Sequence, residues 1–127
     1  MASKRGEIYK CERCGQVIEV IDGAVPALHC CGIPMVAMQA QTADPAENKH
    51  VPVIEAIEQG VRITVGSTLH PMEESHFIEW IEVINGDYVN RKYLKPGDEP
   101  VAEFYVPLQD GLVVREYCNV HGLWTDK

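Results

Sequence analysis

The residues in this chain that are best suited to chemistry are its cysteines, and four of the five lie close together near the start. They form two short pairs, Cys11-x-x-Cys14-Gly15 and Cys30-Cys31-Gly32, separated by 15 residues. Two such pairs can bend toward one another and bind a single tetrahedral metal ion. The spacing therefore predicts a four-thiolate metal site at Cys11, Cys14, Cys30 and Cys31.

The residues around these cysteines restrict the kind of site. A chain that wraps around an ion often needs a positive φ just after a ligand, and the glycine after each pair allows it. Neighbouring side chains of an extended strand point apart, so Cys30 and Cys31 can share one ion only across a local kink, in a somewhat distorted site. Gly15 replaces the histidine of a haem-binding C-x-x-C-H motif, which excludes haem attachment. Structural zinc and strained disulfides stay open as alternatives to iron.

Four histidines and the fifth cysteine form a second set of candidate ligands: His50, His70, His76, His121 and Cys118. His70 and His76 flank one short loop, and Cys118 and His121 form a Cys-x-x-His pair beyond the last expected strand. A lone histidine in a β domain is usually structural, but this number and spacing predict a second metal site. The remaining histidine, His29, is expected to have an ordinary surface role.

The composition of the second set favours iron over copper. A blue-copper site needs one thiolate and only two histidines, often with a weak axial methionine. Here there are four histidines, and no methionine follows His121. Four imidazoles in a plane with a thiolate beneath would leave one face of the ion open, and the thiolate would push electron density toward it. That arrangement suits an iron ion that reacts with a small molecule.

The length, net charge and apolar segments of the chain indicate which partners and which location to expect. The chain has 127 residues and a formal charge of −8, which disfavours binding to nucleic acid or to anionic membranes. No apolar run approaches the roughly 20 residues of a membrane-spanning helix. The first residues are charged without an apolar segment after them, unlike a secretory signal. A cytoplasmic location is expected, where clustered cysteines are more often metal ligands than disulfides.

The pattern of residues predicts a mainly β protein with two domains. Residues 1–36 hold the four clustered cysteines and are too few to fold without a metal or a partner subunit. Residues 37–49 are small and polar and are expected to be a linker. Residues 50–127 form a series of short strands, with a tight turn expected at Asn85-Gly86. We expect strands at 8–10, 16–21, 51–54, 61–65, 77–84, 88–94, 101–106 and 112–117, and a β-sandwich in the second domain.

These motifs, taken in order, resemble those of desulfoferrodoxin, the two-domain class of superoxide reductase, along nearly the whole chain. The segments that carry the resemblance are Tyr9-Lys10-Cys11 to Cys14-Gly15, Cys30-Cys31-Gly32, Lys49-His50-Val51-Pro52-Val53, His70-Pro71-Met72-Glu73-Glu74 to His76, and Arg115-Glu116-Tyr117-Cys118-Asn119 to His121-Gly122. The resemblance implies a small desulforedoxin-like domain with iron on the four clustered cysteines. It also implies an immunoglobulin-like β-sandwich with a catalytic iron.

The same resemblance implies the roles of the second set. His50, His70, His76 and His121 would be equatorial ligands of the catalytic iron, and Cys118 would be axial. The chain would reduce superoxide to hydrogen peroxide with one electron, without dismutation, as a homodimer served by a rubredoxin-like electron donor. Superoxide is an anion and the chain is acidic, so a local positive charge must guide it, and Lys49 beside His50 is the candidate.

One departure from the family pattern concerns the residues before His50. The family commonly has Glu-Lys-His, whereas this chain has Glu47-Asn48-Lys49-His50. Carboxylate ligation of the ferric iron is therefore expected to be lost or altered, while superoxide reduction persists. Two other interpretations stay open: an iron electron carrier whose second site is closed, and a structural zinc protein.

Overall fold

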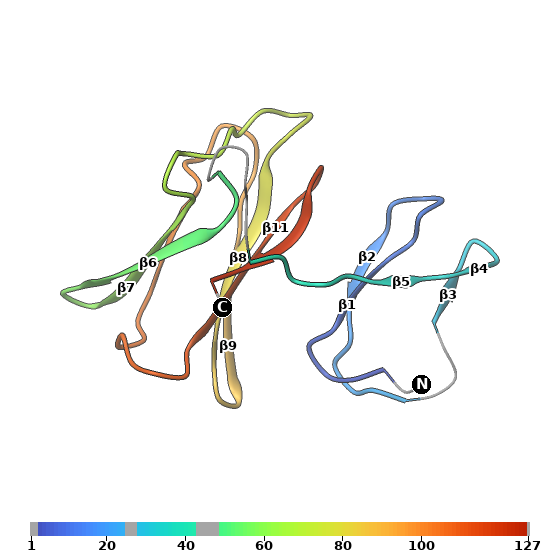
Figure 1. Cartoon of the computed structure of the whole chain (residues 1–127), viewed down its shortest axis with the longest axis horizontal. Coiled ribbons are helices and arrows are strands. Elements are labelled where there is room, and N and C mark those ends of the chain that lie inside the picture. The colour runs from blue at the N-terminus through green and yellow to red at the C-terminus, as the bar shows by residue number, and fades with distance from the viewer. Residues whose placement is uncertain (1–2, 25–27, 43–48, 127) are drawn as a thin grey trace. The chain divides into compact units, whose positions relative to one another are not determined.

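The computed structural model describes residues 3–24, 28–42 and 49–126, and all of its regular elements are strands (Figure 1). The chain divides into two compact units, Met1–Gln39 and Ala40–Lys127. This division lies inside the segment 37–49 that was expected to be a linker. The described residues contain no helix that is long and apolar enough to cross a membrane.

The first unit consists of five very short strands. They are β1 (Ile8–Lys10), β2 (Val17–Glu19), β3 (His29–Cys30), β4 (Ile33–Pro34) and β5 (Val36–Ala37). The sheet order is β2-β1-β5, with β3 and β4 as a separate antiparallel pair. Its described buried hydrophobic residues are Ile8, Cys11 and Val20 alone. A core of this size is too small to hold a fold together unaided, as the sequence predicted.

The backbone around the clustered cysteines has the conformations that the sequence analysis required. Gly15 and Gly32, which follow the two pairs, have φ of 83° and 76°. Cys31 has φ of 55°, which is rare for a residue with a side chain. This conformation provides the kink expected between Cys30 and Cys31.

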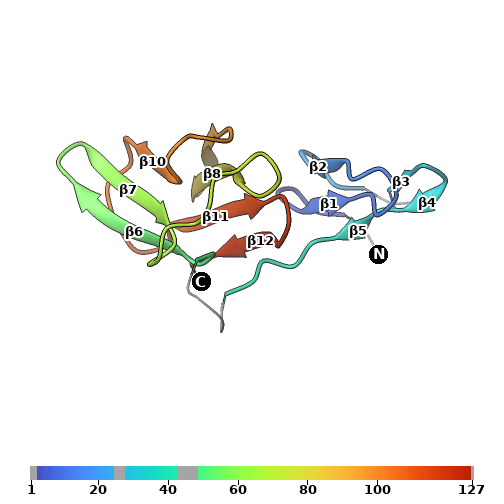
Figure 2. The same cartoon turned by 90° about the horizontal axis from the view of Figure 1, so that it is seen from above.

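The second unit is a β-sandwich of two antiparallel sheets, as expected (Figure 2). One sheet has the order β10-β7-β6, and the other has the order β12-β11-β8-β9. The strands are β6 (Pro52–Ile57), β7 (Gly60–Val65), β8 (Ile78–Asn85), β9 (Tyr88–Tyr93), β10 (Val101–Phe104), β11 (Val113–Cys118) and β12 (Gly122–Thr125). Sheets of three and four strands match an immunoglobulin-like constant-type sandwich.

The core of the sandwich comes from alternate residues of its strands. In β7, Val61, Ile63 and Val65 are fully buried and pack with Ile81 and Val83 of β8. The side chains between them in β7 are only partly buried. Period-two alternation of this kind places one face of a strand against the core. The metal-ligand candidate Cys118 belongs to the same buried cluster.

In the first unit the short strands β3, β4 and β5 were not expected. Two details of the strands expected in the second unit are also wrong. The tight turn after β8 contains Gly86 and Asp87 rather than Asn85 and Gly86, because Asn85 still pairs with Tyr88. Gly86 has φ of 59° and Asn85 has no positive φ, as in a type II′ turn with glycine first. The strand series was also one strand short at its end, since β12 follows β11 in a hairpin.

Candidate metal centres

The four clustered cysteines converge as the spacing predicted. Their sulfur atoms all lie within 4.8 Å of one another. The Cys14 and Cys30 sulfurs are 3.6 Å apart, and those of Cys30 and Cys31 are 3.9 Å apart. Thiolates at about 2.3 Å from a tetrahedral ion would be separated by about 3.8 Å. A disulfide needs about 2.05 Å, and all five cysteines are free, so the disulfide alternative is wrong.

The protonation preferences of these thiols fit a cation. The Cys14 backbone N–H donates to the Cys11 sulfur at 3.4 Å, and this hydrogen bond is the main cause that lowers the pKa of Cys11 to about 6. Hydrogen bonding of the Cys30 thiol to Cys14 and then to Cys11 raises the pKa of Cys30 to about 12. The group therefore ionises once easily and resists further ionisation. A bound metal ion would remove that resistance by compensating the thiolate charges.

The second set of candidate ligands also comes together. One ligand atom from each of His50, His70, His76, Cys118 and His121 lies within 4.8 Å of all the others. Their places in the fold are widely separated: ahead of β6, in the connection from β7 to β8, at the end of β11, and in the turn before β12. The sandwich is therefore what assembles this centre.

The Cys118–His121 pair lies at a hairpin, not beyond the last strand as expected. Cys118 ends β11 and pairs with Gly122 of β12, so the turn between them carries His121. The register against β8 shifts between Tyr117 and Cys118. Such an irregularity re-aims a side chain at the end of a strand, and here it directs the Cys118 sulfur to the histidines.

The four imidazoles form a square. Centroids of neighbouring rings are 4.7 Å apart for His50–His70, 4.6 Å for His70–His76, 5.0 Å for His76–His121 and 4.6 Å for His121–His50. The diagonal from His50 to His76 is 6.4 Å. Neighbouring ring planes are inclined by 67° to 80°. Four rings that surround one point edge to face can direct four nitrogen atoms at one ion in a plane.

Cys118 approaches this square from the buried side. It is 0% exposed, whereas His121 is exposed. Its sulfur lies 3.4 Å from His70 Nε2 and 3.8 Å from His121 Nδ1. Burial raises the pKa of the Cys118 thiol, while hydrogen bonds from the backbone amides of His121 and Val120 lower it. Those amides would stabilise a thiolate once a metal offsets the burial cost.

The histidines have the protonation state that a metal needs. Burial lowers the pKa of His70 to about 4 and, with the neighbouring histidines, also lowers the pKa of His76. His70 Nδ1 lies 2.6 Å from the carbonyl oxygen of Pro71, to which its N–H donates, so Nε2 presents a lone pair to the group. His76 Nε2 is buried and has no hydrogen-bond partner within the described part of the chain. Neutral imidazoles with one orphaned nitrogen fit a metal site.

The other residues singled out by sequence lie in different situations. Lys49 is half-buried beside His50, and its positive charge contributes to the low pKa of His76. Glu47 and Asn48 lie outside the described residues. His29 is exposed in β3, which agrees with a surface role.

Three residues to which the sequence assigned no role lie at or near the histidine centre. Asn119 accepts the N–H of Phe77 at 2.9 Å and donates to the carbonyl oxygen of Ser75 at 3.2 Å, which ties the Cys118 turn to the His76 loop. Trp124 stacks on His50. Glu116 is buried without a described partner for its carboxyl oxygens, and burial raises its pKa. Glu116 and Asn119 belong to a segment that carries the family resemblance, whereas for Trp124 the only signal was its closeness to His121 in the sequence.

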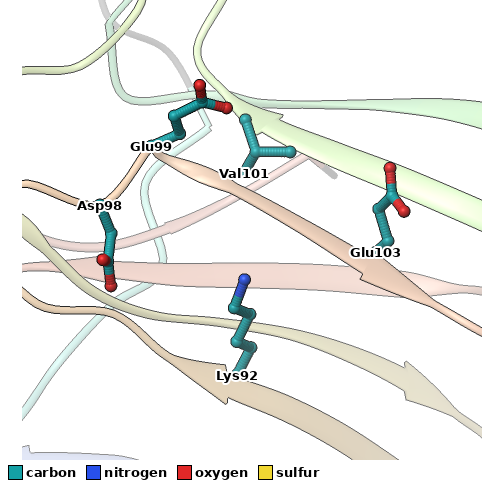
Figure 3. A pocket seen from close by; sticks show the side chains of 5 residues that line it. All are labelled: Lys92, Asp98, Glu99, Val101 and Glu103. Atoms are coloured by element: carbon teal, nitrogen blue, oxygen red, sulfur yellow. The ribbon is translucent and has the colours of Figure 1, made fainter.

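A separate open hollow of about 700 Å³ lies between β9 and β10. Its lining consists of Lys92, Asp98, Glu99, Val101 and Glu103 (Figure 3). Glu103 is already paired with Arg62 at 2.7 Å. None of the predicted metal ligands lines this hollow, and its three carboxylates would repel an anion such as superoxide.

The chain matches two family models along most of its length. Residues 3–38 match the desulfoferrodoxin N-terminal domain, and residues 42–127 match desulfoferrodoxin. A desulfoferrodoxin homolog of Archaeoglobus fulgidus is 53% identical over 93% of this chain and 94% of its own. The desulfoferrodoxin of Nitratidesulfovibrio vulgaris is 52% identical over 93% of each chain.

Solved structures agree with these sequence relatives. The superoxide reductase of Treponema pallidum matches with a TM-score of 0.71 and 25% identity, over 95% of this chain and 96% of its own. The reduced superoxide reductase (neelaredoxin) of Archaeoglobus fulgidus matches with a TM-score of 0.52 and 32% identity, over 68% of this chain and 93% of its own.

Proposed function

Because this chain belongs to the desulfoferrodoxin family, we propose that it is a superoxide reductase, which reduces superoxide to hydrogen peroxide with one electron and does not dismutate it. The observation that carries the proposal is the square of four imidazoles with a buried thiol on one side. The names of the solved structures that resemble this chain support the same activity.

The proposed ligands of the catalytic iron are His50, His70, His76, His121 and Cys118. Together they would hold ferrous iron, which would supply one electron and bind a small anion. Reduction of one superoxide consumes that electron and two protons and yields one hydrogen peroxide. Because His121 is exposed and His76 is half-buried, water can reach the ligand group at these two histidines and deliver the protons.

The chain's own groups would prepare the centre for this reaction. The Pro71 carbonyl holds His70 in one tautomer, and the amides of Val120 and His121 stabilise negative charge on the Cys118 sulfur. Cys118 would hold the iron as a thiolate and would supply electron density that favours release of the product. The hydrogen bonds of Asn119 hold the loop that carries His76 next to the turn that carries Cys118 and His121.

Lys49 is proposed to attract superoxide. The chain carries a net charge of −8, so a small anion reaches the centre only through a local positive field. The effect of Lys49 on the pKa of His76 supports a position close to the square. We expect Lys49→Gln to lower the second-order rate with superoxide and to weaken its dependence on salt. Lys49→Arg should retain both, and Lys92→Gln, in the acidic hollow that no predicted ligand lines, is the matched control. Equal rates for Lys49→Gln and the unaltered chain would contradict this role.

The activity itself is tested by generating a pulse of superoxide over the anaerobically reduced protein. We expect one hydrogen peroxide for each oxidised histidine-ligated iron and no oxygen from dismutation. Oxygen released in step with peroxide would contradict reductase chemistry. A loaded centre that superoxide does not oxidise would favour the electron carrier. Colourless protein with zinc at both centres would favour the structural metal protein, since both ferric sites absorb visible light.

The remaining proposals concern the surroundings of the catalytic centre. We propose iron at the four-cysteine centre, a homodimer, and a rubredoxin-like electron donor, all supported by the family resemblance. The cytoplasmic location and the altered carboxylate ligation at Asn48 stay predictions. Metal analysis and sedimentation of the intact protein test the first two. Stopped-flow reduction by a rubredoxin, with loss of reduction in Cys30→Ser, tests whether electrons enter through the first iron.

A further inference from the structure

One aromatic side chain lies against the histidine square without being a ligand. The indole of Trp124, in β12, is stacked on the ring of His50, with centroids 4.6 Å apart and planes inclined by 16°. Trp124 is 5% exposed and His50 is 8% exposed. His50 is also touched edge to face by His70 and His121. The indole therefore covers a face of the His50 ring.

His50 differs from the other histidines in its backbone surroundings. It precedes β6 and follows residues 43–48, which lie outside the described part of the chain. By contrast, the backbone N–H of His70 donates to Val65 at 2.9 Å, and His76 forms a bridge with Glu73. His121 lies in the tight β11–β12 hairpin. The stack of Trp124 on His50 is therefore a contact that can set the plane of the His50 ring.

The strand that carries Trp124 is itself anchored next to the centre. The N–H of Gln41 donates to the carbonyl of Leu123, and the N–H of Thr125 donates to the carbonyl of Gln41, both at 2.9 Å. The side-chain amide of Gln41 donates to the carbonyl of His121 at 2.8 Å. These bonds fix the backbone on both sides of Trp124, so the base of its indole side chain is held in place.

The indole acts through its ring face and not through its N–H. Trp124 Nε1 is buried and has no hydrogen-bond partner among the described residues. An aromatic ring without that N–H would preserve the stacking contact, although with a smaller area. An aliphatic side chain would fill part of the space but would not hold the plane of the imidazole.

We propose that Trp124 is a positioning residue for the catalytic centre: by stacking on His50, it sets the plane of that imidazole and so directs Nε2 at the metal. This role rests on the proposed function only in assuming that the histidine square holds iron. Loss of the stack should leave His50 free to turn, which weakens its bond to the ion and shifts the potential of the centre.

The test compares Trp124→Leu and Trp124→Phe in the full-length, iron-loaded protein. For Trp124→Leu we expect about 10- to 100-fold weaker iron binding at the histidine centre, the range seen when a residue that orients a ligand is lost. Its reduction potential and its thiolate-to-iron absorption should shift as well. Trp124→Phe should recover most of both properties. The four-cysteine centre of the same molecule is an internal control and should keep its spectrum and affinity.

The chain offers a matched control in its second tryptophan. Trp80 is buried to a similar degree but stacks on Tyr117 rather than on a histidine. Trp80→Leu should cost stability without moving the potential of the histidine centre. The proposal is overturned if Trp124→Leu folds and leaves iron affinity and potential unchanged. It is equally overturned if Trp124→Phe, or the control Trp80→Leu, loses as much as Trp124→Leu.

These readouts separate the positioning role from the enzymatic one. Iron affinity, potential and absorption are measured without superoxide. If the unaltered chain binds iron at both centres but does not reduce superoxide, the proposed function fails while the result on Trp124 stands. If the unaltered chain reduces superoxide and the Trp124 variants keep its potential, only the positioning role fails.

Discussion

The two candidate centres are built in opposite ways. The four cysteines lie within residues 11–31 of a unit whose described buried hydrophobic residues are Ile8, Cys11 and Val20. The histidine centre draws on residues 50–121 and sits on a sandwich with a continuous core from both sheets. In the first unit the ion would hold the chain together, whereas in the second the chain holds the ligands in place for the ion.

The chemistry follows this difference. Cys14 and Cys31 are exposed, so an ion in the first centre would be close to solvent and surrounded by four ligands, with no room for a substrate. In the second centre the thiol, His50 and His70 are buried, whereas His76 is half-buried and His121 is exposed. A closed site suits structure or electron transfer, and a site with one accessible side suits reaction with a small molecule.

Removal of the metal from both centres is expected to produce the largest difference in stability between the two units. The first unit should unfold, because binding of a structural ion to four thiolates contributes about 10–16 kcal/mol and no other core replaces it. The sandwich should stay folded. Hydrogen exchange of the metal-free chain should show unprotected amides in β1 and β2 and protected amides in β7 and β8. Protection of β1 and β2 without metal would contradict the contrast between the units.

The next largest effect is expected from a substitution in the core of the sandwich, which should lower the stability of that unit alone. Ile81 is 0% exposed in the core, and Ile81→Ala should lower the free energy of unfolding of the sandwich by about 2–5 kcal/mol. The spectrum of the four-cysteine centre should not change. Ile21→Ala makes the same change at a residue that is 71% exposed in the first unit, and should alter stability by at most about 0.5 kcal/mol. Thermal melts of the holoprotein compare the two.

A smaller effect concerns pH and the metal-free sandwich. The pKa of His70 is about 4 in the folded chain, below its ordinary 6.5, so the unfolded chain binds more protons between these values. Stability should therefore be complete above about pH 6.5 and should fall as the pH drops toward 4. At 1.36 kcal/mol per unit, the loss is on the order of 3 kcal/mol.

Urea unfolding of the metal-free protein at a series of pH values measures this loss. His70→Gln should flatten the dependence, because it removes the buried titrating ring. His29→Gln, at the exposed histidine of β3, should leave it as it was. A profile for His70→Gln as steep as that of the unaltered chain would assign the pH dependence to other groups.

The smallest effect tests the backbone at the first centre. Gly32 has φ of 76° with nothing within 4 Å of an added Cβ, so Gly32→Ala introduces conformational strain without a clash. Its cost of about 1–2 kcal/mol should appear as roughly 10-fold weaker metal binding by the four cysteines. Gly86→Ala places the same strain in the β8–β9 turn and should leave that affinity unchanged. Metal competition with a chelator distinguishes them.

Prediction from sequence was accurate where short-range patterns decide the structure. The alternation in β7 and the glycines after the cysteine pairs predicted local conformations correctly, because the period of a strand and the need for positive φ act over a few residues. The turn at Gly86 was misplaced by one residue, since Asn-Gly also suits a hairpin whose register is shifted. The strand β12 was missed because its residues, Gly122–Thr125, are few and are buried on both faces rather than alternating.

The sequence by itself determined which residues are available as metal ligands. It predicted two sets of ligands, one of four thiolates and one of four imidazoles with a thiolate, and a series of strands that could position the second set. Only the tertiary structure decided that His50 and His76 stand at opposite corners of one square, with Cys118 on its buried side and Trp124 against His50. The physical reason is distance along the chain. Contacts between residues dozens of positions apart depend on how two sheets pack and on where a strand shifts register, and no local preference of those residues encodes either.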